Sequence, residues 1–458
     1  GKRVAIWGYG REGRAALWAL RRRVPELPLT LFCSEAEVSS VRGELTIPTP
    51  PCAAQPARIE IISEPPNAAM LSAFDTVIKS PGISAYRAEI LEARRNGTRF
   101  SSGTALWFAE NPDARVIAVT GTKGKSTTTA LIAHLLRGLG RSVALAGNIG
   151  MPLLDLLDPP QQPDWWVIEL SSFQTRDAGP IEVGVINNLF DEHLDWHGNR
   201  ERYTDDKLAL ADVARTLIVN GEQHELLART AQHRRRVVFG ASAGWHVGDA
   251  FVACGKESIV ALGDVQLPGK HNAKNVCAAL AAIDAAGEDA HAAARHIASF
   301  RPLPHRLQTL GERDGITWID DSIATTPQAT LQALATVADR AVTVLVGGVD
   351  RGVDWQPFVE CVCARPPQAI ITLGANGPRI AALLREFGFG APLQEATTLH
   401  AAMECARAVT PIGGVILLSP GAPSFDQFRD YAERGRRFAE LAGFDPEAIG
   451  QIEGLGIL

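Results

Sequence analysis

The residues with the clearest chemistry form one glycine-rich stretch, residues 120–127, which read Thr-Gly-Thr-Lys-Gly-Lys-Ser-Thr. Successive backbone N–H groups in such a turn hold phosphate oxygens, and the helix that follows adds its positive end. Lys125 would reach the β- and γ-phosphates, and the Ser126 hydroxyl would bind Mg²⁺. The common loop has a further glycine where this chain has Val119, so this is a tighter form. The stretch predicts a nucleoside triphosphate site formed by Gly121, Thr122, Lys123, Gly124, Lys125, Ser126 and Thr127.

A strand and a helix must flank this loop, and the sequence has patterns for both. Residues 116–119 are an apolar, β-branched run typical of a buried parallel strand. Residues 128–136 carry small and apolar side chains at helical spacing. The alternative is an ordinary glycine-rich turn with a lysine beside it. Such a turn would not require a strand before it and a helix after it.

Acidic side chains and a histidine follow two further predicted strands. Glu169 comes directly after the apolar run 165–168, where a carboxylate can hold the Mg²⁺ of a bound nucleotide. The alternative is an acid that starts a helix. Residues 191–195 contain three acids and His193 and follow the predicted strand 183–187. This cluster suits a hard metal, although a structural histidine is equally consistent with it.

Near the N-terminus, residues 8–13 read Gly-Tyr-Gly-Arg-Glu-Gly after the predicted strand 2–7. This pattern is typical of dinucleotide-binding folds. An NAD-binding domain would have an acid at the end of its second strand, where this chain has Cys33 and Ser34. A Rossmann-like domain that holds a different phosphorylated ligand is therefore favoured over an NAD-dependent oxidoreductase.

Four other features have both a functional and an ordinary interpretation. The turn 80–82, Ser-Pro-Gly, could face a ligand with its free backbone donors or simply connect two elements. Asn275 could read a base edge, or it could cap a helix. Arg306 could bind the γ-phosphate, or it could be solvated. Lys207 by itself resembles an ordinary surface lysine.

Composition limits the class of protein. The chain of 458 residues is 46% hydrophobic and 21% charged, which is ordinary for a globular protein. A net charge of −6 gives no reason to expect nucleic acid as a partner, and no apolar run is long enough to cross a membrane. Its seven cysteines are scattered, so we expect reduced thiols and a cytoplasmic location.

Strands and helices alternate along the chain, which predicts an α/β protein of three domains. We expect a Rossmann-like domain at 1–103, a central P-loop ATPase domain with a parallel sheet at 104–301, and a second Rossmann-like domain at 302–458. In the last domain a polar or glycine-rich cluster follows each predicted strand, so these clusters should line one crevice.

Taken together, the motifs resemble those of the Mur ligases, the ATP-dependent amide-forming enzymes of peptidoglycan synthesis. The resemblance covers nearly the whole chain. Several motifs occur in the same order, and Glu-Leu-Ser-Ser-Phe-Gln at 169–174 and Ser-Phe-Asp-Gln-Phe at 424–428 are most similar to the type that adds glutamate to UDP-N-acetylmuramoyl-L-alanine. The other shared motifs are the phosphate loop, His193-Leu-Asp, Tyr203 with Lys207, His271-Asn272 with Asn275, Pro304-His305-Arg306, Asp321-Ser and Leu418-Ser-Pro.

The resemblance implies a role for each candidate residue. A substrate carboxylate attacks the γ-phosphate of ATP, and the amino group of glutamate displaces phosphate from the resulting acyl phosphate. Catalytic roles would fall to Lys125, His193, Lys207 and Arg306. Two Mg²⁺ ions would be held by Ser126, Glu169, His193 and a carbamylated Lys207. ATP would be contacted by Asn275, Arg306 and Asp321. The UDP-sugar would be contacted by Gly10, Ser80, Gly82 and Asn148. The glutamate would be contacted by Thr325, Arg351, Ser424 and Tyr431. We expect a monomer that acts on small molecules.

Several positions depart from the family pattern. Residues 33–35, Cys-Ser-Glu, replace the cluster that commonly surrounds uracil. Ile323 stands where the glutamate-adding type usually has a lysine, Arg351 replaces another lysine, and Tyr431 replaces a phenylalanine. Since arginine and lysine bind carboxylates differently, the changed pocket indicates altered amino-acid recognition. The chain then resembles the related ligases that add L-glutamate, so we expect L-glutamate and not D-glutamate as the substrate. The alternatives are ordinary D-glutamate ligation, a ligase similar to folylpolyglutamate synthetase, and a P-loop NTPase switch.

Overall fold

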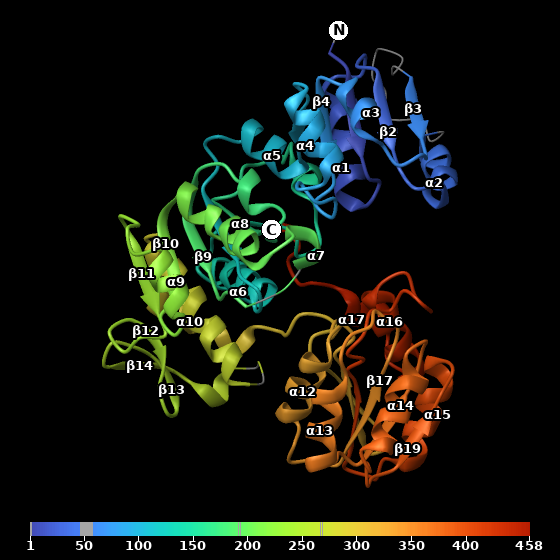
Figure 1. Cartoon of the computed structure of the whole chain (residues 1–458). Coiled ribbons are helices and arrows are strands. Elements are labelled where there is room, and N and C mark those ends of the chain that lie inside the picture. Colours follow the sequence, from blue (N-terminus) through green and yellow to red (C-terminus); the bar gives the residue numbers. More distant parts are fainter. Residues whose placement is uncertain (1, 46–57, 191, 193, 266, 268) are drawn as a thin grey trace. The chain divides into compact units, whose positions relative to one another are not determined.

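The computed structural model describes residues 2–45, 58–190, 192, 194–265, 267 and 269–458. The chain divides into two compact units (Figure 1). The first unit contains Gly1–Gln266, Lys270–Phe300 and Gly454–Leu458, and the second contains Leu267–Gly269 and Arg301–Glu453.

The first unit begins with a parallel sheet in the strand order β3-β2-β1-β4-β5. Its central strands are short, apolar and buried, as expected for a parallel sheet covered by helices. The elements are β1 (Val4–Trp7), α1 (Arg11–Arg23), β2 (Leu29–Phe32), α2 (Glu35–Leu45), β3 (Ile59–Ile62), α3 (Ala68–Ser72), β4 (Thr76–Lys79), α4 (Ala88–Arg95), β5 (Arg99–Ser101) and α5 (Gly103–Glu110).

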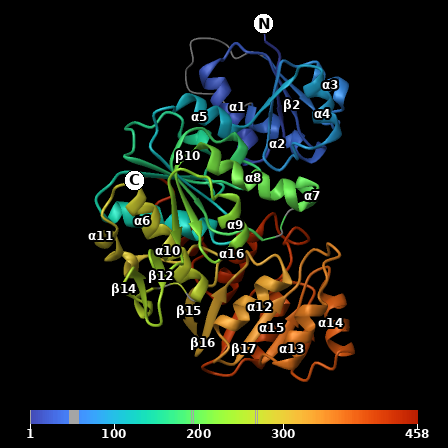
Figure 2. The ribbon, with the colours of Figure 1, turned by 60° about the vertical axis from the view of Figure 1, so that its left-hand side comes forward.

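A second sheet in the same unit has the order β11-β10-β9-β6-β8-β7-β21 and is parallel except for β21. Helices α6 and α10 pack side by side (Figures 1 and 2). The elements are β6 (Val116–Thr120), α6 (Lys125–Gly138), β7 (Val143–Gly147), η1 (Leu153–Leu156), β8 (Trp165–Glu169), η2 (Thr175–Asp177), β9 (Ile181–Ile186), α7 (Leu194–His197), α8 (Arg200–Val213), β10 (Ala214–Asn220), α9 (His224–Arg229), β11 (Arg236–Phe239), α10 (Lys270–Ala285), α11 (Ala290–Ala294), η4 (Ile297–Ser299) and β21 (Gly456–Ile457). A small antiparallel sheet is formed by β12 (Trp245–Val247), β13 (Phe251–Cys254) and β14 (Glu257–Ala261), followed by η3 (Leu262–Asp264).

One hydrophobic core joins the two large sheets of the first unit. It includes Ile6 from the first sheet and Val116 from the second, with α5 between them. Trp107 of α5 is fully buried, and its ring lies 4.6 Å from that of Trp166. Because both sheets bury apolar surface against the same helix, they form one compact body.

The second unit has a sheet in the order β15-β16-β20-β17-β18-β19, parallel except for the β15–β16 pair. Its elements are β15 (Gln308–Arg313), β16 (Ile316–Asp320), α12 (Pro327–Thr336), β17 (Val342–Val346), α13 (Gln356–Ala364), β18 (Ala369–Thr372), α14 (Gly377–Glu386), β19 (Leu393–Glu395), α15 (Leu399–Val409), β20 (Val415–Leu418), α16 (Tyr431–Ala442) and α17 (Pro446–Gly450).

The predicted α/β class with parallel sheets is confirmed. The helix after the phosphate loop begins earlier than predicted, at Lys125, because the loop itself turns into the first helical residues. The predicted boundary at 103/104 lies inside the first unit, and residues 454–458 belong to that unit and not with 302–453. The three domain ranges stay predictions.

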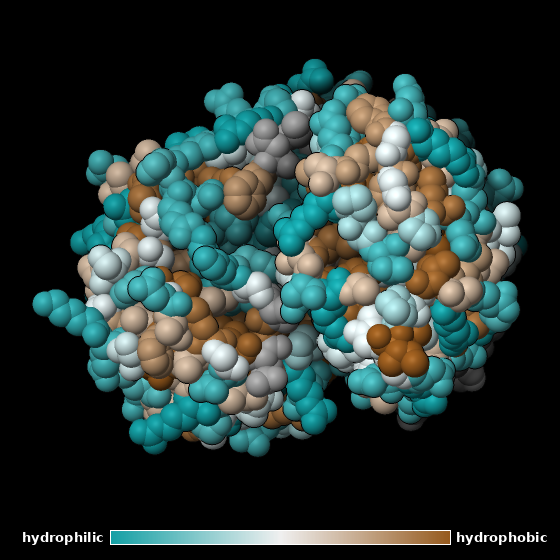
Figure 3. All heavy atoms as spheres, turned by 90° about the horizontal axis from the view of Figure 1, so that it is seen from below, coloured by the Kyte–Doolittle hydropathy of each residue, from teal (hydrophilic) through white to brown (hydrophobic). Residues whose placement is uncertain are grey.

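On the face shown in Figure 3, hydrophobic residues lie in separate groups among hydrophilic ones. Such scattered apolar residues are normal on a protein surface. Within the described residues, we find no helix with the length and apolar character needed to span a bilayer.

Candidate functional site

The phosphate loop has backbone angles that only glycine adopts easily. Gly121 has φ +148° and Gly124 has φ +80°. A Cβ on Gly124 would lie 2.4 Å from Oδ1 of Asn275, so a larger residue would not fit. The predicted ATP contact Asn275 therefore lies beside the loop. Its Nδ2 also donates to Oδ1 of Asn272, 3.0 Å away.

Side chains from neighbouring segments hold the loop in place. Asn188 Oδ1 accepts hydrogen bonds from the backbone N–H groups of Thr122 and Lys123, at 3.0 and 2.8 Å. The Thr122 hydroxyl lies 2.7 Å from the hydroxyl of Tyr203. Lys125 Nζ donates to the Thr122 carbonyl at 3.0 Å, so this ammonium stays at the loop. Asn188 was not among the predicted site residues. Its only signal was its place in the polar run that follows a strand.

Glu169 is the last residue of β8 and pairs with Val119 of β6 next to it. It is 1% exposed, and its Oε1 accepts a hydrogen bond from Asn148 Nδ2 at 2.7 Å. Its Oε2 is buried and has no hydrogen-bond partner among the described residues. A buried carboxylate oxygen without a donor is costly, and a cation would satisfy it. This arrangement fits the predicted Mg²⁺ site.

Lys207 lies on α8 and is only 2% exposed. Its Nζ donates to the Gly121 carbonyl at 2.8 Å and lies 4.9 Å from the centre of the Tyr203 ring. Burial, with the nearby Lys125 cation, holds the pKa of Lys207 well below its usual value, against the attraction of Glu192 and Glu169. Lys207 is thus a buried lysine at the phosphate loop and not the solvated lysine that its position alone suggested.

Other predicted metal ligands are less completely placed. His193 and Asp191 lie outside the described residues. Ser126 is the second residue of α6, directly after Lys125. The described part of the chain has no group of three or more His, Cys, Asp or Glu side chains arranged to hold a metal. The metal set therefore stays a prediction, with Glu169 as its best-supported member.

The predicted UDP-sugar residues come from three loops that contact one another. Gly10 precedes α1, where Arg11 donates to the Gly150 carbonyl at 2.8 Å, in the loop that contains Asn148. Ser80 Oγ donates to the Gly8 carbonyl at 3.2 Å. Gly82 lies in the turn that Ile83 N closes onto the Ser80 carbonyl. The structure thus brings the start of α1, the turn 80–82 and the loop 147–150 together.

In the second unit, Arg306 lies in a tight turn before β15. His305 and Leu307 on either side have φ +63° and +47°, which non-glycine residues rarely adopt. The turn is tied to the end of β16 because His305 Nδ1 lies 2.6 Å from Asp320 Oδ2 and Leu307 N donates to Asp321 Oδ1 at 3.2 Å. Burial raises the pKa of Asp321 to about 7, although the hydrogen bond from Ser419 opposes this shift.

Three of the predicted glutamate residues, Thr325, Arg351 and Ser424, lie on loops after adjacent strands, and Tyr431 begins α16. The loops after β17 and β20 meet where Val349 N donates to the Pro423 carbonyl at 2.9 Å. Thr325 and Arg351 are exposed, and the Arg351 guanidinium lies 5.8 Å from the Phe425 ring. Ser424 is buried, and the carbonyl of Tyr431 accepts from Ser322 Oγ at 2.8 Å. The polar clusters thus share one edge of the sheet, and the crevice that we expect them to line stays a prediction.

Sequence reasoning missed Arg434 on α16, which is 1% exposed. Its guanidinium donates to the hydroxyl and carbonyl of Ser322 at 3.0 and 2.9 Å and to the Ala422 carbonyl at 3.0 Å. Burial lowers its pKa to about 10. Arg434 therefore links the loops after β16 and β20. An arginine in a helix gives no sequence signal of this role, since most are solvated.

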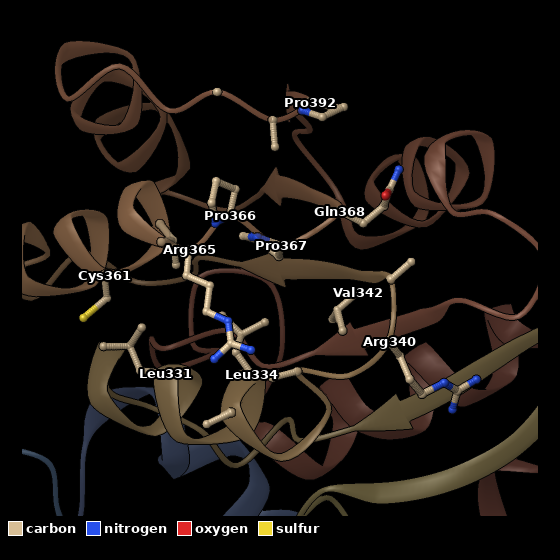
Figure 4. A pocket seen from close by; sticks show the side chains of 16 residues that line it. Leu331, Leu334, Arg340, Val342, Cys361, Arg365, Pro366, Pro367, Gln368 and Pro392 are labelled. Atoms are coloured by element: carbon tan, nitrogen blue, oxygen red, sulfur yellow. The ribbon is translucent and has the colours of Figure 1, made fainter.

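A hollow of about 790 Å³ also lies in the second unit (Figure 4). Its lining includes Leu331, Arg340, Cys361, Arg365 and Pro392. These residues come from α12, α13 and the segments before β17, β18 and β19, at the amino ends of the strands. None of the predicted site residues lines it.

Comparison with known proteins identifies the family of the chain. The family descriptions "Mur ligase middle domain" and "Mur ligase, glutamate ligase domain" match residues 119–283 and 305–421. A protein of Xanthomonas euvesicatoria pv. vesicatoria named UDP-N-acetylmuramoyl-L-alanine--L-glutamate ligase is 50% identical, covering 100% of this chain and 98% of that protein. A protein of the same name from a Micromonospora species is 38% identical, with 96% of both covered.

Among solved structures, UDP-N-acetylmuramate-alanine ligase MurC from Thermotoga maritima aligns with a TM-score of 0.60 at 20% identity, covering 97% of this chain and 99% of that one. MurF from Acinetobacter baumannii aligns with a TM-score of 0.62 at 17% identity, covering 88% and 90%. At these identities the likeness concerns the fold. The sequence matches go further: the chain belongs to the Mur ligase family of ATP-dependent, amide-forming ligases.

Proposed function

We propose that this protein joins L-glutamate to UDP-N-acetylmuramoyl-L-alanine in peptidoglycan synthesis, with ATP converted to ADP and phosphate. The observation that carries the proposal is the pairing of the phosphate loop with the buried, unsatisfied oxygen of Glu169 at the end of the adjacent strand. Relatives that are 50% identical over the whole chain bear the name of this reaction.

The residues suggest how the reaction runs. The carboxylate of the alanyl substrate attacks the γ-phosphorus, the bond to the β-phosphate oxygen breaks, and ADP leaves. The amino group of glutamate then attacks the acyl carbon, phosphate leaves, and the amide forms with loss of a proton. Lys125 and Arg306 are the cations that would stabilise the charge on the transferred phosphoryl group. Asn275 and Asp321 would hold the adenosine.

We assign one Mg²⁺ to Ser126 and Glu169, and a second to His193 and a carbamylated Lys207, with Glu169 shared. Bound there, Mg²⁺ would neutralise phosphate charge during the transfer. The Glu169 oxygen without a donor and the burial of Lys207 support this assignment. A carbamate would convert a buried amine into an anionic oxygen ligand.

The same proposal assigns the remaining parts of the chain. Residues 1–103 would form a Rossmann-like UDP-sugar domain with Gly10, Ser80, Gly82 and Asn148 at the substrate. Residues 104–301 would form the ATPase domain, and 302–458 a Rossmann-like domain that selects glutamate. We further propose a cytoplasmic monomer, which sedimentation at working concentration would test.

The choice of L-glutamate rests on the pocket residues and the names of the relatives. Ile323 lies in the loop after β16, where the D-glutamate-adding type usually has a lysine, and its backbone N–H donates to the His305 carbonyl at 3.2 Å. Arg351 presents a planar fork to a carboxylate in place of a lysine ammonium. These changes alter both the number and the position of the cations that meet the substrate carboxylates.

Ligation assays decide between the enantiomers. The purified protein is incubated with Mg²⁺, ATP and UDP-N-acetylmuramoyl-L-alanine, together with L- or D-glutamate, and the dipeptidyl product and ADP are measured. We expect product with L-glutamate. Product with D-glutamate alone would reject the stereochemical proposal, and ADP release without any amide product would reject the ligase proposal.

A further inference from the structure

A cluster of buried polar side chains lies behind the phosphate loop, around Asp206 of α8. Asp206 Oδ2 lies 2.6 Å from His197 Nδ1, and its Oδ1 accepts from the Tyr86 hydroxyl at 2.7 Å and from the Arg176 guanidinium. His197 Nε2 lies 3.0 Å from the Ser172 hydroxyl. Ser172, His197 and Asp206 are all at least 95% buried. We call these three residues the Asp206 cluster.

Each member of the Asp206 cluster lies within four residues of a predicted Mg²⁺ ligand in the sequence. Ser172 is in the loop that begins after Glu169, at the end of β8. His197 ends α7, a helix that starts directly after His193. Asp206 precedes Lys207 on α8. Figure 2 shows α7 and α8 adjacent to each other. Three separate segments of the chain are therefore tied together by two consecutive side-chain hydrogen bonds.

The cluster is also tied to the turn that carries the predicted UDP-sugar residues Ser80 and Gly82. Trp196 Nε1 donates to the Pro81 carbonyl at 3.0 Å, and Ser84 Oγ donates to the Trp196 carbonyl at 2.5 Å. Tyr86, on the same segment, reaches Asp206 itself. The segments that bear the predicted metal ligands and the predicted sugar-binding turn are thus linked by short, partly buried contacts.

We propose that Asp206 and His197 are positioning residues that hold the segments bearing Glu169 and Lys207 at the spacing that Mg²⁺ binding requires. The inference rests on the proposed metal set. Metal sites depend on partners outside the ligands for their geometry, because ligand side chains must be held within a few tenths of an ångström.

A different chemistry is conceivable for the same atoms. Ser172, His197 and Asp206 are connected through the nitrogens that a hydrolytic Ser-His-Asp triad uses. Two observations favour positioning. Ser172 is 4% exposed, and Asp206 also accepts hydrogen bonds from Arg176 and Tyr86, so it is not dedicated to the histidine. A hollow of about 310 Å³ borders Ser172 and Asp206, so a small reagent can be used to test the nucleophile directly.

The test compares Asp206→Asn with Asp205→Asn in the full-length protein. Asp205 is the preceding residue on α8 and pairs with Arg229 on the exposed side of the helix. Mn²⁺ binding is measured by electron paramagnetic resonance with a non-hydrolysable ATP analogue present, and thermal unfolding is recorded alongside. We expect Asp206→Asn to weaken Mn²⁺ binding about tenfold, the lower range for residues behind a metal ligand, and Asp205→Asn to match the wild type.

Tyr86→Phe provides a milder variant if Asp206→Asn does not fold, since it removes one hydrogen bond to Asp206 and keeps the ring. It should weaken Mn²⁺ binding about threefold, because a net hydrogen bond contributes about 1 kcal/mol or less. Wild-type Mn²⁺ affinity in folded Asp206→Asn, or in Tyr86→Phe, would overturn positioning. Labelling of Ser172 by a fluorophosphonate would overturn it in favour of a nucleophile. A wild-type protein that forms no amide product would instead reject the proposed function.

Discussion

The phosphate-loop region of the first unit and the glutamate loops of the second unit are built in different ways. In the first, two of the residues assigned to Mg²⁺ are buried: Glu169 is 1% exposed and Lys207 2%. In the second, Arg351 is exposed and Tyr431 is 39% exposed. Under the proposed function, phosphoryl transfer takes place at the phosphate loop, beside buried side chains. The amino acid is selected by exposed side chains, which can change with little effect on the fold.

The physical reason lies in what each region has to recognise. Phosphate oxygens are held by backbone N–H groups, which requires particular φ and ψ angles at Gly121 and Gly124 and a fixed loop. A carboxylate can be bound by one exposed guanidinium, because the arginine side chain only has to extend to it and keep its N–H donors available. Five variants test this contrast, in order of decreasing effect apart from Asp350→Asn, which is the comparison for Asp321→Asn.

The largest effect is expected at the phosphate loop. Lys125→Ala should reduce kcat/KM by about 10³-fold, because one preorganised charge at a developing anion typically contributes this much. Thermal unfolding is recorded alongside, because Lys125 Nζ also donates to the Thr122 carbonyl of its own loop. ATP turnover coupled to amide formation is the measurement. A loss below about tenfold would remove Lys125 from the mechanism.

Asp321 is an exception to this contrast, because it is a buried acid in the second unit, where the other side chains compared are exposed. Its folded-state pKa of about 7 exceeds its usual 3.8, so the fold favours the protonated form and loses stability as pH rises from 3.8 to about 7. The loss is on the order of 4 kcal/mol, at about 1.4 kcal/mol per pH unit. Asp321→Asn, which cannot ionise, should gain stability relative to wild type over this window in denaturant titrations.

Asp350 provides the matched comparison for that titration. The Gly352 N–H and the Arg379 guanidinium hold its pKa below the usual value, so its contribution should be present at neutral pH and lost as pH falls below 3.8. Asp350→Asn should therefore show the opposite trend, and a smaller one because this side chain is exposed. Parallel pH curves for the two variants would contradict both assignments.

Arg434 tests whether the exposed loops depend on a buried support. Arg434→Met should lower the free energy of unfolding by about 2 kcal/mol, because the carbonyls of Ser322 and Ala422 lose a donor. The KM for glutamate should rise as the loops shift. Arg437→Met, on the exposed side of the same helix, is the control. Equal effects of the two variants would show that the buried arginine is not a support.

The smallest effect is expected at Arg351. Arg351→Lys should raise the KM for glutamate about tenfold with kcat nearly unchanged, because the fork is lost but the charge is kept. Stability should be unaffected, since the side chain is exposed. A fall in kcat at constant KM would place Arg351 at the phosphoryl transfer and not at the amino acid.

Much of the fold was predictable because its signals are local. The predicted strands at 116–119 and 165–168 lie within β6 and β8, since short apolar runs between polar segments leave little choice. The polar clusters of the second unit were correctly expected at one edge, because parallel strands place their carboxyl ends together. The site residues themselves stay predictions, with His193 outside the described residues.

Other features had no local signal. Arg434 and Asp206 lie on helices, where charged residues are solvated by default, and only packing shows that they are buried. Residues 456–457 form β21, which pairs with β7 of the central sheet. A two-residue strand far along the chain cannot be recognised from its own composition, so the predicted range 302–458 included it.

The amino-acid sequence by itself determined the phosphate loop, because the glycine positions and the following helix set the backbone within a few residues. It also determined the α/β class through the alternation of apolar strands and helices. Tertiary structure alone decided which charges are buried, which strand ends meet and which carboxylate oxygen lacks a donor. Burial and hydrogen-bond satisfaction depend on residues far apart in the chain, and no short stretch of sequence contains them.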